Sequence, residues 1–435
     1  MKLDYKKTLL VGFAFFLITC FWQAYDTIVP LILTNKFNLM QTWSGAIMAL
    51  DNVLATVLLP LFGNISDKSK SRFGKRTPFI VVGTIIASAL FGFLGLVNNL
   101  AVFIILLLLN LLAMSVFRSP AVALMPDVTV KPLRSKANAI INLMGTVGGI
   151  IILLFATIFK TGTPGKTDFT AYMFATSGVM IVALLVFVLT VRENAWVKQR
   201  EENEVLYGLV DATSQEQGET SSQKLSRPEL KSLIFILSSV ALWYTGYNAV
   251  TSKYSVYATN FLGIDYSLTL IIAQAAAVVS YIPAGLITSK FGRKKVIMAG
   301  VIMLTMAFTF AAFIREGTSP LLMTVLFILA GIGWAIINVN SFPMAVELAK
   351  GSDVGKYTGY YYTASMAAQV ITPVLSGALM DAFGSIWGLG RPGYEVLFPY
   401  SAVFVALAFV TMFFVKHGDS KPLSKKGLEA LDVED

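Results

Sequence analysis

Two acidic residues, Asp26 and Asp51, interrupt long apolar stretches that carry no other charge. Asp26 lies eight residues before the end of stretch 8–34, and Asp51 lies nine residues into stretch 42–65. These spacings are about 12 and 13 Å along a helix. If the two stretches form an antiparallel hairpin, the carboxylates lie at one depth and can face each other. An acid pair in a low-dielectric environment can take up and release a proton. The alternative is a structural acid that is hydrogen-bonded to a polar neighbour such as Asn52 or Tyr25.

The stretches that hold these acids belong to a chain with the composition of a membrane protein. Of its 435 residues, 56% are hydrophobic and 14% are charged, and the mean hydropathy is +0.70. Apolar runs of about 18 residues or more, the length typical of transmembrane helices, recur along it. We therefore predict an all-α membrane protein with twelve transmembrane helices, at about 8–34, 42–65, 77–97, 99–125, 137–159, 170–191, 232–259, 266–288, 294–314, 320–343, 356–380 and 397–416.

The distribution of positive charge predicts how these helices are oriented. A net charge of +9 would suggest nucleic acid as the partner of a soluble protein. Here most lysines and arginines fall on one side when the N-terminus is placed inside, which is the positive-inside rule. We therefore expect both termini in the cytoplasm, the lipid bilayer of the plasma membrane around the helices, and no nucleic-acid partner.

Cysteine and histidine are too few for several kinds of chemistry. Cys20 is the single cysteine, and His417, in the C-terminal tail, is the single histidine. No disulfide within the chain and no histidine-based metal or proton site can form. No nucleophile–base or metal constellation is evident either. We therefore expect neither an enzyme nor a bound metal or organic cofactor.

Two basic turns, half a chain apart, indicate an internal repeat. The first is GNISDKSKSRFGKRTP at 63–78 and the second is GLITSKFGRKK at 285–295, so their first glycines are 222 residues apart. The same offset aligns WQAYD at 22–26 with YTGYN at 244–248, and an offset of 223 aligns Pro120 with Pro343. Such a repeat predicts two pseudo-symmetric halves of six helices with a central site between them. The predicted parts are the halves 1–191 and 232–416, a cytoplasmic linker at 192–231 and a cytoplasmic tail at 417–435.

The turn GxxxD…RxGKR, its second copy and the repeat of six plus six helices resemble the major facilitator superfamily. PLFGNISDKSKSRFGKRTPFI, the run from Arg118 to Asn138, and GKYTG at 355–359 resemble its sucrose-transporter and glycoside–pentoside–hexuronide:cation symporter branch. The resemblance covers the chain from the first to the last predicted helix. It implies the major facilitator fold, alternating access by rocking of the two halves, and a monomer.

The resemblance also assigns charged residues to a cytoplasmic gate. In the superfamily, the acid of the basic turn and its arginines bridge the two halves, which assigns this role to Asp67, Arg72 and Arg76. The second turn has Ser289 where the acid belongs, so only the first turn is expected to form the full set of contacts. The alternative is that both turns only set the orientation. The further predicted gate charges are Asp127, Arg134 and Arg293.

Aromatic and amide side chains predict the class of substrate, because several lie on the helices that line the central cavity by resemblance. Flat aromatic faces bind the C–H surfaces of sugars, and amides and charged groups bind the hydroxyls. Each residue singly could instead be a helix-packing residue. The predicted substrate-binding residues are Trp22, Tyr25, Arg118, Asn142, Trp243, Tyr244, Tyr247, Asn248, Asn338 and Gln369.

Two basic residues have competing explanations. Arg118 could hold sugar hydroxyls or pair with an acid, or its side chain could extend to the headgroups. Lys253, at almost the depth of the two acids, could pair with them or could likewise extend to the membrane surface.

The repeat favours protons as the coupling ion. Asn248 aligns with Asp26, so an amide satisfies the shape of the motif and the carboxylate needs another reason. Sodium would need several oxygen ligands. Relatives resembling melibiose permease carry two acids a turn apart where this chain has Ala55 and Leu59. We therefore predict proton-coupled symport of a small sugar or glycoside, with a disaccharide as the favoured size. An exporter of drugs or other metabolites from another branch is the alternative.

Overall fold

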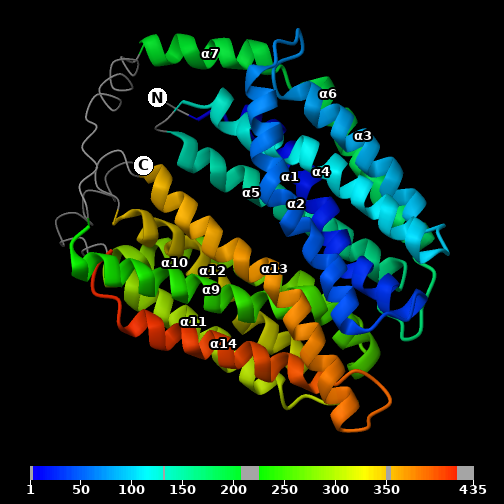
Figure 1. The fold of residues 1–435 in the computed structure, drawn as a ribbon. Coiled ribbons are helices and arrows are strands. Elements are labelled where there is room, and N and C mark those ends of the chain that lie inside the picture. The colour runs from blue at the N-terminus through cyan, green and yellow to red at the C-terminus, as the bar shows by residue number, and fades with distance from the viewer. Residues whose placement is uncertain (1–2, 131–132, 207–224, 349–353, 419–435) are drawn as a thin grey trace. The chain divides into compact units, whose positions relative to one another are not determined.

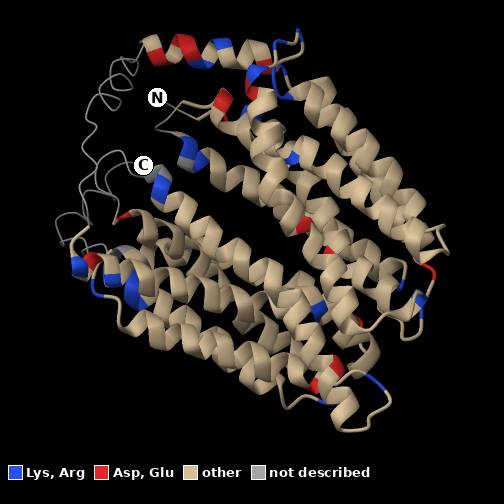
Figure 2. Cartoon of the chain, viewed as in Figure 1, with Lys and Arg blue, Asp and Glu red and all other residues tan. Residues whose placement is uncertain are grey.

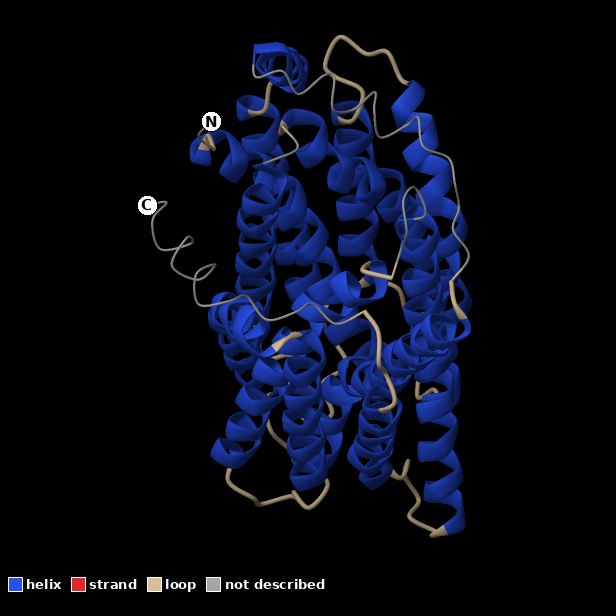
Figure 3. Cartoon of the chain, turned by 90° about the vertical axis from the view of Figure 1, so that its left-hand side faces the viewer, coloured by secondary structure: helices blue, strands red, loops and turns tan. Residues whose placement is uncertain are grey.

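The computed structural model describes residues 3–130, 133–206, 225–348 and 354–418. Helices dominate this part of the chain, and it contains no strand (Figure 3). By its internal contacts the chain divides into two units. Unit 1 comprises residues 1–215 and 252–271, and unit 2 comprises residues 216–251 and 272–435.

Unit 1 contains the first seven α-helices (Figure 1) and a later segment at 252–271. Its helices α1 and α4 begin at side-chain caps, because Asp4 and Asn99 each accept a hydrogen bond from a backbone N–H of the first turn. Its helices are α1 (Tyr5–Leu31), which continues as the π-helix η1 (Ile32–Lys36), α2 (Gln41–Lys68), α3 (Thr77–Leu94), α4 (Leu100–Val128), α5 (Arg134–Ile158), α6 (Thr170–Thr190) and α7 (Glu193–Leu206).

Unit 2 contains the later helices, except that the end of α9 and the segment after it belong to unit 1. This later segment of unit 1, 252–271, includes the π-helix η3 (Tyr257–Leu262) and the first residues of α10. The remaining elements are α9 (Arg227–Val256), α10 (Tyr266–Phe291), α11 (Arg293–Ala311), α12 (Pro320–Val346), α13 (Val354–Ile386), the short 3-10 helix η5 (Tyr394–Val396) and α14 (Leu397–Phe413).

The prediction of an all-α membrane protein is confirmed. Among the described residues, eleven helices are long and apolar enough to cross a membrane, and α10 adds the shorter apolar helix Tyr266–Tyr281. Charged residues lie mostly near the helix ends, and few interrupt the middle of the helices (Figure 2). Large apolar side chains such as Leu189 and Val279 are more than 70% exposed. Lipid tails can cover such side chains.

Two stretches differ from the sequence-based expectation. The helix predicted at 356–380 is longer than expected, because α13 continues to Ile386. The backbone of 391–393 folds back closely onto Gly384, where a Cβ atom would lie 2.3 Å from the Arg391 carbonyl oxygen. The stretch 192–231, which was expected to be a cytoplasmic linker, begins with helix α7.

Close helix packing in both units depends on small residues. In unit 1, α1 packs against α5 and α6, and α3 packs against α4 and α6. In unit 2, α11 packs against α12 and α14. Gly300 of α11 and Gly333 of α12 face each other, and a Cβ atom on either would lie 2.8 Å from the carbonyl oxygen of the other. Such contacts replace the hydrophobic effect as the source of helix association in lipid.

Replacing Gly300 by alanine should lower the melting temperature, because the new methyl would meet the Gly333 carbonyl and the side chains of Ile336 and Ile337. Overpacking costs about 1–3 kcal/mol, which exceeds the ~0.5–1 kcal/mol that alanine gains over glycine in a helix. Gly178 of α6 has open space at its Cβ position, so Gly178→Ala is the matched control and should keep or raise the melting temperature. An unchanged melting temperature for Gly300→Ala would contradict this packing.

Candidate functional site

The structure brings Asp26, Asp51 and Arg118 together inside unit 1. They come from α1, α2 and α4 respectively. The carboxylate of Asp26 interacts electrostatically with that of Asp51, and Arg118 interacts with both. All three side chains are partly exposed and partly enclosed by their neighbours. We call these three residues the charge cluster.

The charge cluster is one positive charge short of neutrality when all three groups are ionised. Two carboxylates and one guanidinium carry a net charge of −1, so a single proton balances the set. Uncompensated charge is costly in an apolar environment. This arrangement can therefore hold one proton and release it when the surroundings change.

Aromatic residues of α1 hold Arg118 and border the acids. The Arg118 guanidinium lies over the Trp22 ring, 5.0 Å from its centre, which is a cation–π contact. Tyr25 is fully buried and stacks on Phe21. Neither the Tyr25 hydroxyl nor the Trp22 indole N–H has a hydrogen-bond partner among the described residues. Arg118 is therefore bound within the bundle and does not extend to a membrane surface.

Asp51 also has a local partner. The backbone N–H and the side-chain amide of Asn52 donate to Oδ1 of Asp51, at 2.5 and 2.7 Å. One oxygen of Asp51 is thus hydrogen-bonded to a polar neighbour, as expected for a structural acid. The same carboxylate also interacts electrostatically with Arg118.

Unit 2 contains an aromatic stack that joins two predicted substrate-binding residues, Tyr244 and Tyr247, to Trp334. The rings of Tyr247 and Trp334 are parallel, with centres 3.7 Å apart, and Tyr244 meets Trp334 edge-on at 5.3 Å. The hydroxyls of Tyr244 and Tyr361 are hydrogen-bonded. Asn338 is exposed, and its side chain is hydrogen-bonded to Tyr281. The aromatic stack, Tyr244, Tyr247 and Trp334, therefore combines flat faces with tyrosine hydroxyl groups.

The other predicted binding residues are less well placed in this conformation. Trp243 has no exposed surface and packs inside unit 2. Asn248 accepts a hydrogen bond from Thr251. Asn142 and Gln369 each donate to the backbone carbonyl four residues earlier, and Asn142 is exposed while Gln369 is half-buried.

The basic turn of unit 1 forms a network around Arg76. This guanidinium donates to Ser66, to Asp67 and, at 2.7 Å, to Asp127 of α4. Lys75 lies 3.6 Å from the same Asp127 carboxylate. Burial alone would lower the pKa of Arg76, but its bonds to Asp127 and Asp67 outweigh burial and raise the pKa. We call residues 69–76 the gate turn, and the end of unit 1 that carries it the basic end.

The other predicted gate arginines make different contacts. Arg72 is exposed and lies over the Phe73 ring, 4.7 Å from its centre. Arg134 donates to two backbone carbonyls at the end of α4. Arg293 pairs with Glu347 inside unit 2. Arg76 is thus the arginine of the gate turn that contacts Asp67 and Asp127.

Two residues with notable contacts were missed or left open by the sequence. Glu193 of α7 accepts hydrogen bonds from the start of α3, and nothing in a charged linker distinguishes it from its neighbours. Lys253 is 1% exposed, and its Nζ donates to the backbone carbonyl and side-chain oxygen of Gln41, at 2.8 and 3.2 Å. The Lys253 ammonium group is therefore buried and bound to the first residue of α2.

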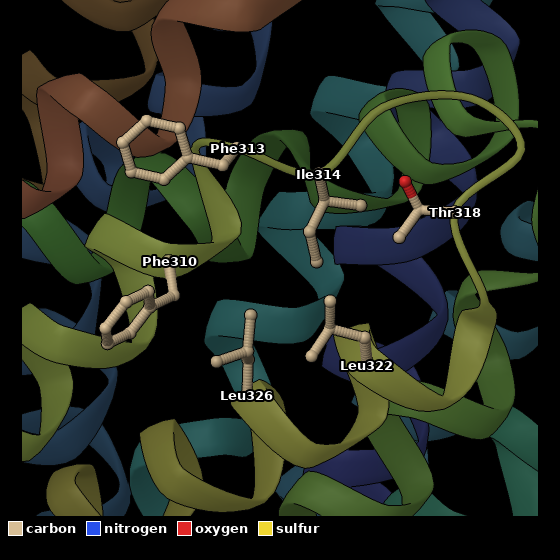
Figure 4. Close-up of a pocket in the computed structure, with 6 residues that line it drawn as sticks. All are labelled: Phe310, Phe313, Ile314, Thr318, Leu322 and Leu326. Carbon is tan, nitrogen blue, oxygen red and sulfur yellow. The ribbon is translucent and has the colours of Figure 1, made fainter.

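A pocket of about 370 Å³ lies in unit 2, and its lining includes none of the predicted site residues. Aromatic and aliphatic side chains surround it, and the Thr318 hydroxyl is the one polar group on its lining side chains (Figure 4). None of its lining side chains can take up a proton near neutral pH, and a single hydroxyl cannot bind several sugar hydroxyls. Its lining residues are Phe310, Phe313, Ile314, Thr318, Leu322 and Leu326.

Known proteins resemble this chain over most of its length. The family model described as MFS/sugar transport protein matches residues 10–384. The chain is 23% identical to the MFS-type transporter MJ1317 of Methanocaldococcus jannaschii, over 94% of this chain and 95% of that protein. It is 37% identical to lactose permease of Lactobacillus helveticus, but over only 17% of this chain and 12% of that protein.

Solved structures support the same fold. The inward-open xylose transporter XylE from E. coli superposes with a TM-score of 0.68 at 14% identity, and the match covers 98% of this chain and 99% of that one. At this identity the likeness concerns the fold alone. Together with the family match it confirms the major facilitator fold of twelve helices and a multi-pass membrane transporter that is not an enzyme. The chain belongs to the MFS/sugar transport protein family.

Proposed function

We propose that this transporter is a symporter that moves a small sugar or glycoside together with a proton. The observation that carries the proposal is the charge cluster, in which the carboxylates of Asp26 and Asp51 both interact electrostatically with Arg118. A proton on one acid balances its charge, and loss of that proton leaves a charge that Arg118 alone cannot compensate. Proton binding can therefore favour one conformation of the transporter over another, which is the requirement for coupling.

The repeat supports Asp26 as the coupling acid. Its counterpart in the second half, Asn248, is bound to Thr251 and carries no charge. Aspartate and asparagine have nearly the same shape, but only aspartate can carry a charge. An acid at position 26 and an amide at position 248 are therefore expected if only the first half binds the proton.

The aromatic stack and the family description support a sugar as the substrate. Tyr247 and Trp334 are stacked on each other, and an outer face of this pair can cover the C–H surface of a sugar ring. The hydroxyls of Tyr244 and Tyr361 can bind sugar hydroxyls. The family is named for sugar transport, and the local match to lactose permease agrees with a disaccharide.

The proposal includes an orientation and a gate. We place the basic end of unit 1 in the cytoplasm, with both termini on that side of the plasma membrane, because the basic turns obey the positive-inside rule. The network of Asp67, Arg76 and Asp127 acts as the first half's part of the cytoplasmic gate. The halves 1–191 and 232–416 move as the alternating bodies, and a monomer is sufficient for this cycle.

Asp26→Asn should abolish proton-driven accumulation of the sugar, because the amide keeps the shape of the side chain but cannot take up a proton. Exchange of labelled sugar across the membrane should remain, because the binding residues are unchanged. Both quantities are measured as uptake of labelled sugar into proteoliposomes, with and without a pH gradient.

The matched control for this variant is Asp168→Asn. Asp168 is an exposed acid in the loop before α6, where it accepts a hydrogen bond from the Thr170 backbone N–H. This control should accumulate sugar as the wild type does. Undiminished accumulation by Asp26→Asn would remove Asp26 from the coupling role.

Trp334→Ala should raise the KM for the sugar by roughly tenfold, since an aromatic contact contributes about 0.5–1.5 kcal/mol beyond its buried area. Trp334→Phe should retain most of the affinity, and Trp387→Ala, which removes an exposed indole at the end of α13, should not change it. The KM is measured from initial rates of uptake. An unchanged KM in Trp334→Ala would exclude the aromatic stack from the binding site.

Asp67→Asn should slow transport by roughly three- to tenfold without a large change in KM, because it weakens the network around Arg76 but lies outside the binding residues. The maximal rate and KM of uptake separate the two effects. A selective loss of affinity at a normal maximal rate would contradict the gate role.

A further inference from the structure

Glu193, the first residue of α7, is a buried carboxylate at the basic end of unit 1. Only 1% of its surface is exposed, although it follows α6 in a stretch rich in charged residues. It accepts hydrogen bonds from the Arg76 backbone N–H at 2.9 and 3.1 Å, and from the backbone N–H and the hydroxyl of Thr77, both at 2.8 Å. This many donors can offset the cost of burying a charged side chain.

These donors are the free N–H groups at the start of α3. The first N–H groups of a helix have no partner within the helix, and a carboxylate there is also favoured by the helix dipole. Arg76, the N-cap residue of α3, provides no side-chain cap of its own. Glu193 therefore caps α3 from a position 117 residues further along the chain.

The gate turn is shaped to admit Glu193. Gly74 has φ +111°, and a Cβ atom there would lie 2.2 Å from a Glu193 carboxylate oxygen. The next residue, Asn194, donates to the backbone carbonyl of Arg72 at 2.9 Å. The start of α7 thus contacts the gate turn at three places along its backbone.

The rest of α7 is tied to the first helix. Lys7 of α1 lies over the Trp196 ring at 5.5 Å and donates to Gln199 at 3.3 Å. Helix α7 lies at the same end of unit 1 as the gate turn and runs across the bundle (Figure 1). It is therefore docked on unit 1 at both its first residues and its middle.

Glu193 and the two gate acids, Asp67 and Asp127, all bind Arg76. The backbone of Arg76 is bound by Glu193, and its guanidinium is bound by Asp67 and Asp127. Because a guanidinium is a rigid fork, two acids from different helices can share it only if its backbone is correctly placed. A shift of this backbone would weaken both contacts together.

We propose that Glu193 is a positioning residue for the cytoplasmic gate: it sets the backbone of Arg76 so that the guanidinium bridges Asp67 and Asp127. The first turn of α7 then contributes to the gate, in addition to connecting the two halves of the chain. The gate role of Arg76 rests on the proposed function, but the capping and positioning of Arg76 do not.

The first test is hydrogen exchange of the full-length protein in lipid nanodiscs, which needs no substrate. Glu193→Ala should speed the exchange of the amides of residues 76–77 by roughly tenfold or more. Exchange should also rise near Ser66 and Asp127, which bind the Arg76 side chain and are not bonded to Glu193. A cap without a positioning role would leave those two regions unchanged.

The second test separates position from charge. Glu193→Gln keeps an oxygen that can accept from the same N–H groups, so it should restore most of the protection and also serves if the alanine variant folds poorly. Glu202→Ala removes an exposed acid from the same helix and should have no effect. With a transported sugar in hand, Glu193→Ala should slow maximal uptake by roughly three- to thirtyfold at an unchanged KM.

Two results would overturn the proposal. Normal exchange at residues 76–77 in a folded Glu193→Ala protein would show that Glu193 does not cap α3. Faster exchange there with unchanged exchange near Ser66 and Asp127 would show a cap that does not position Arg76. Failure to find any transported sugar would count against the proposed function. The exchange results would still test whether Glu193 caps α3 and positions Arg76, because they need no substrate.

Discussion

The cost of placing charge in an apolar helical bundle is the constraint on which the arrangement of unit 1 depends. A single charged residue in the middle of a membrane helix costs about 2.5–3.5 kcal/mol or more. Asp26 and Asp51 are therefore retained beside Arg118, whose guanidinium is in turn held over Trp22. When all three groups are ionised, the cluster carries a net charge of −1. Binding one proton makes the cluster neutral, and neutrality is favoured in an apolar environment.

The same constraint applies to the other buried charges of the described residues. Arg76 is enclosed by Ser66, Asp67 and Asp127, Glu193 by the first N–H groups of α3, and Lys253 by Gln41. Each of these bonds joins residues from different helices or from distant parts of the chain. We propose that some of these bonds change when the transporter changes shape.

The sequence predicted the helices well because hydropathy and the repeat are local or periodic signals. It also suggested that Asp26 and Asp51 face each other, because depth in a hairpin follows from residue counting. It could not choose Arg76 over Arg72, since both stand in one basic turn and only the fold shows which guanidinium reaches Asp127. Glu193 was missed because its partners are 116 and 117 residues away. Trp243 shows the limit for single aromatic residues, because the side of a helix that is buried depends on its neighbours.

Sugar-induced proton uptake tests the central claim most directly. Vesicles that contain the protein, without any imposed gradient, are mixed with sucrose, maltose, melibiose and several pentosides while the external pH is recorded. The account predicts that at least one sugar makes the medium more alkaline, that sodium does not change this response, and that Asp26→Asn abolishes it. A transported sugar that moves without any change of pH, or with a change that survives in Asp26→Asn, would contradict coupling through the charge cluster.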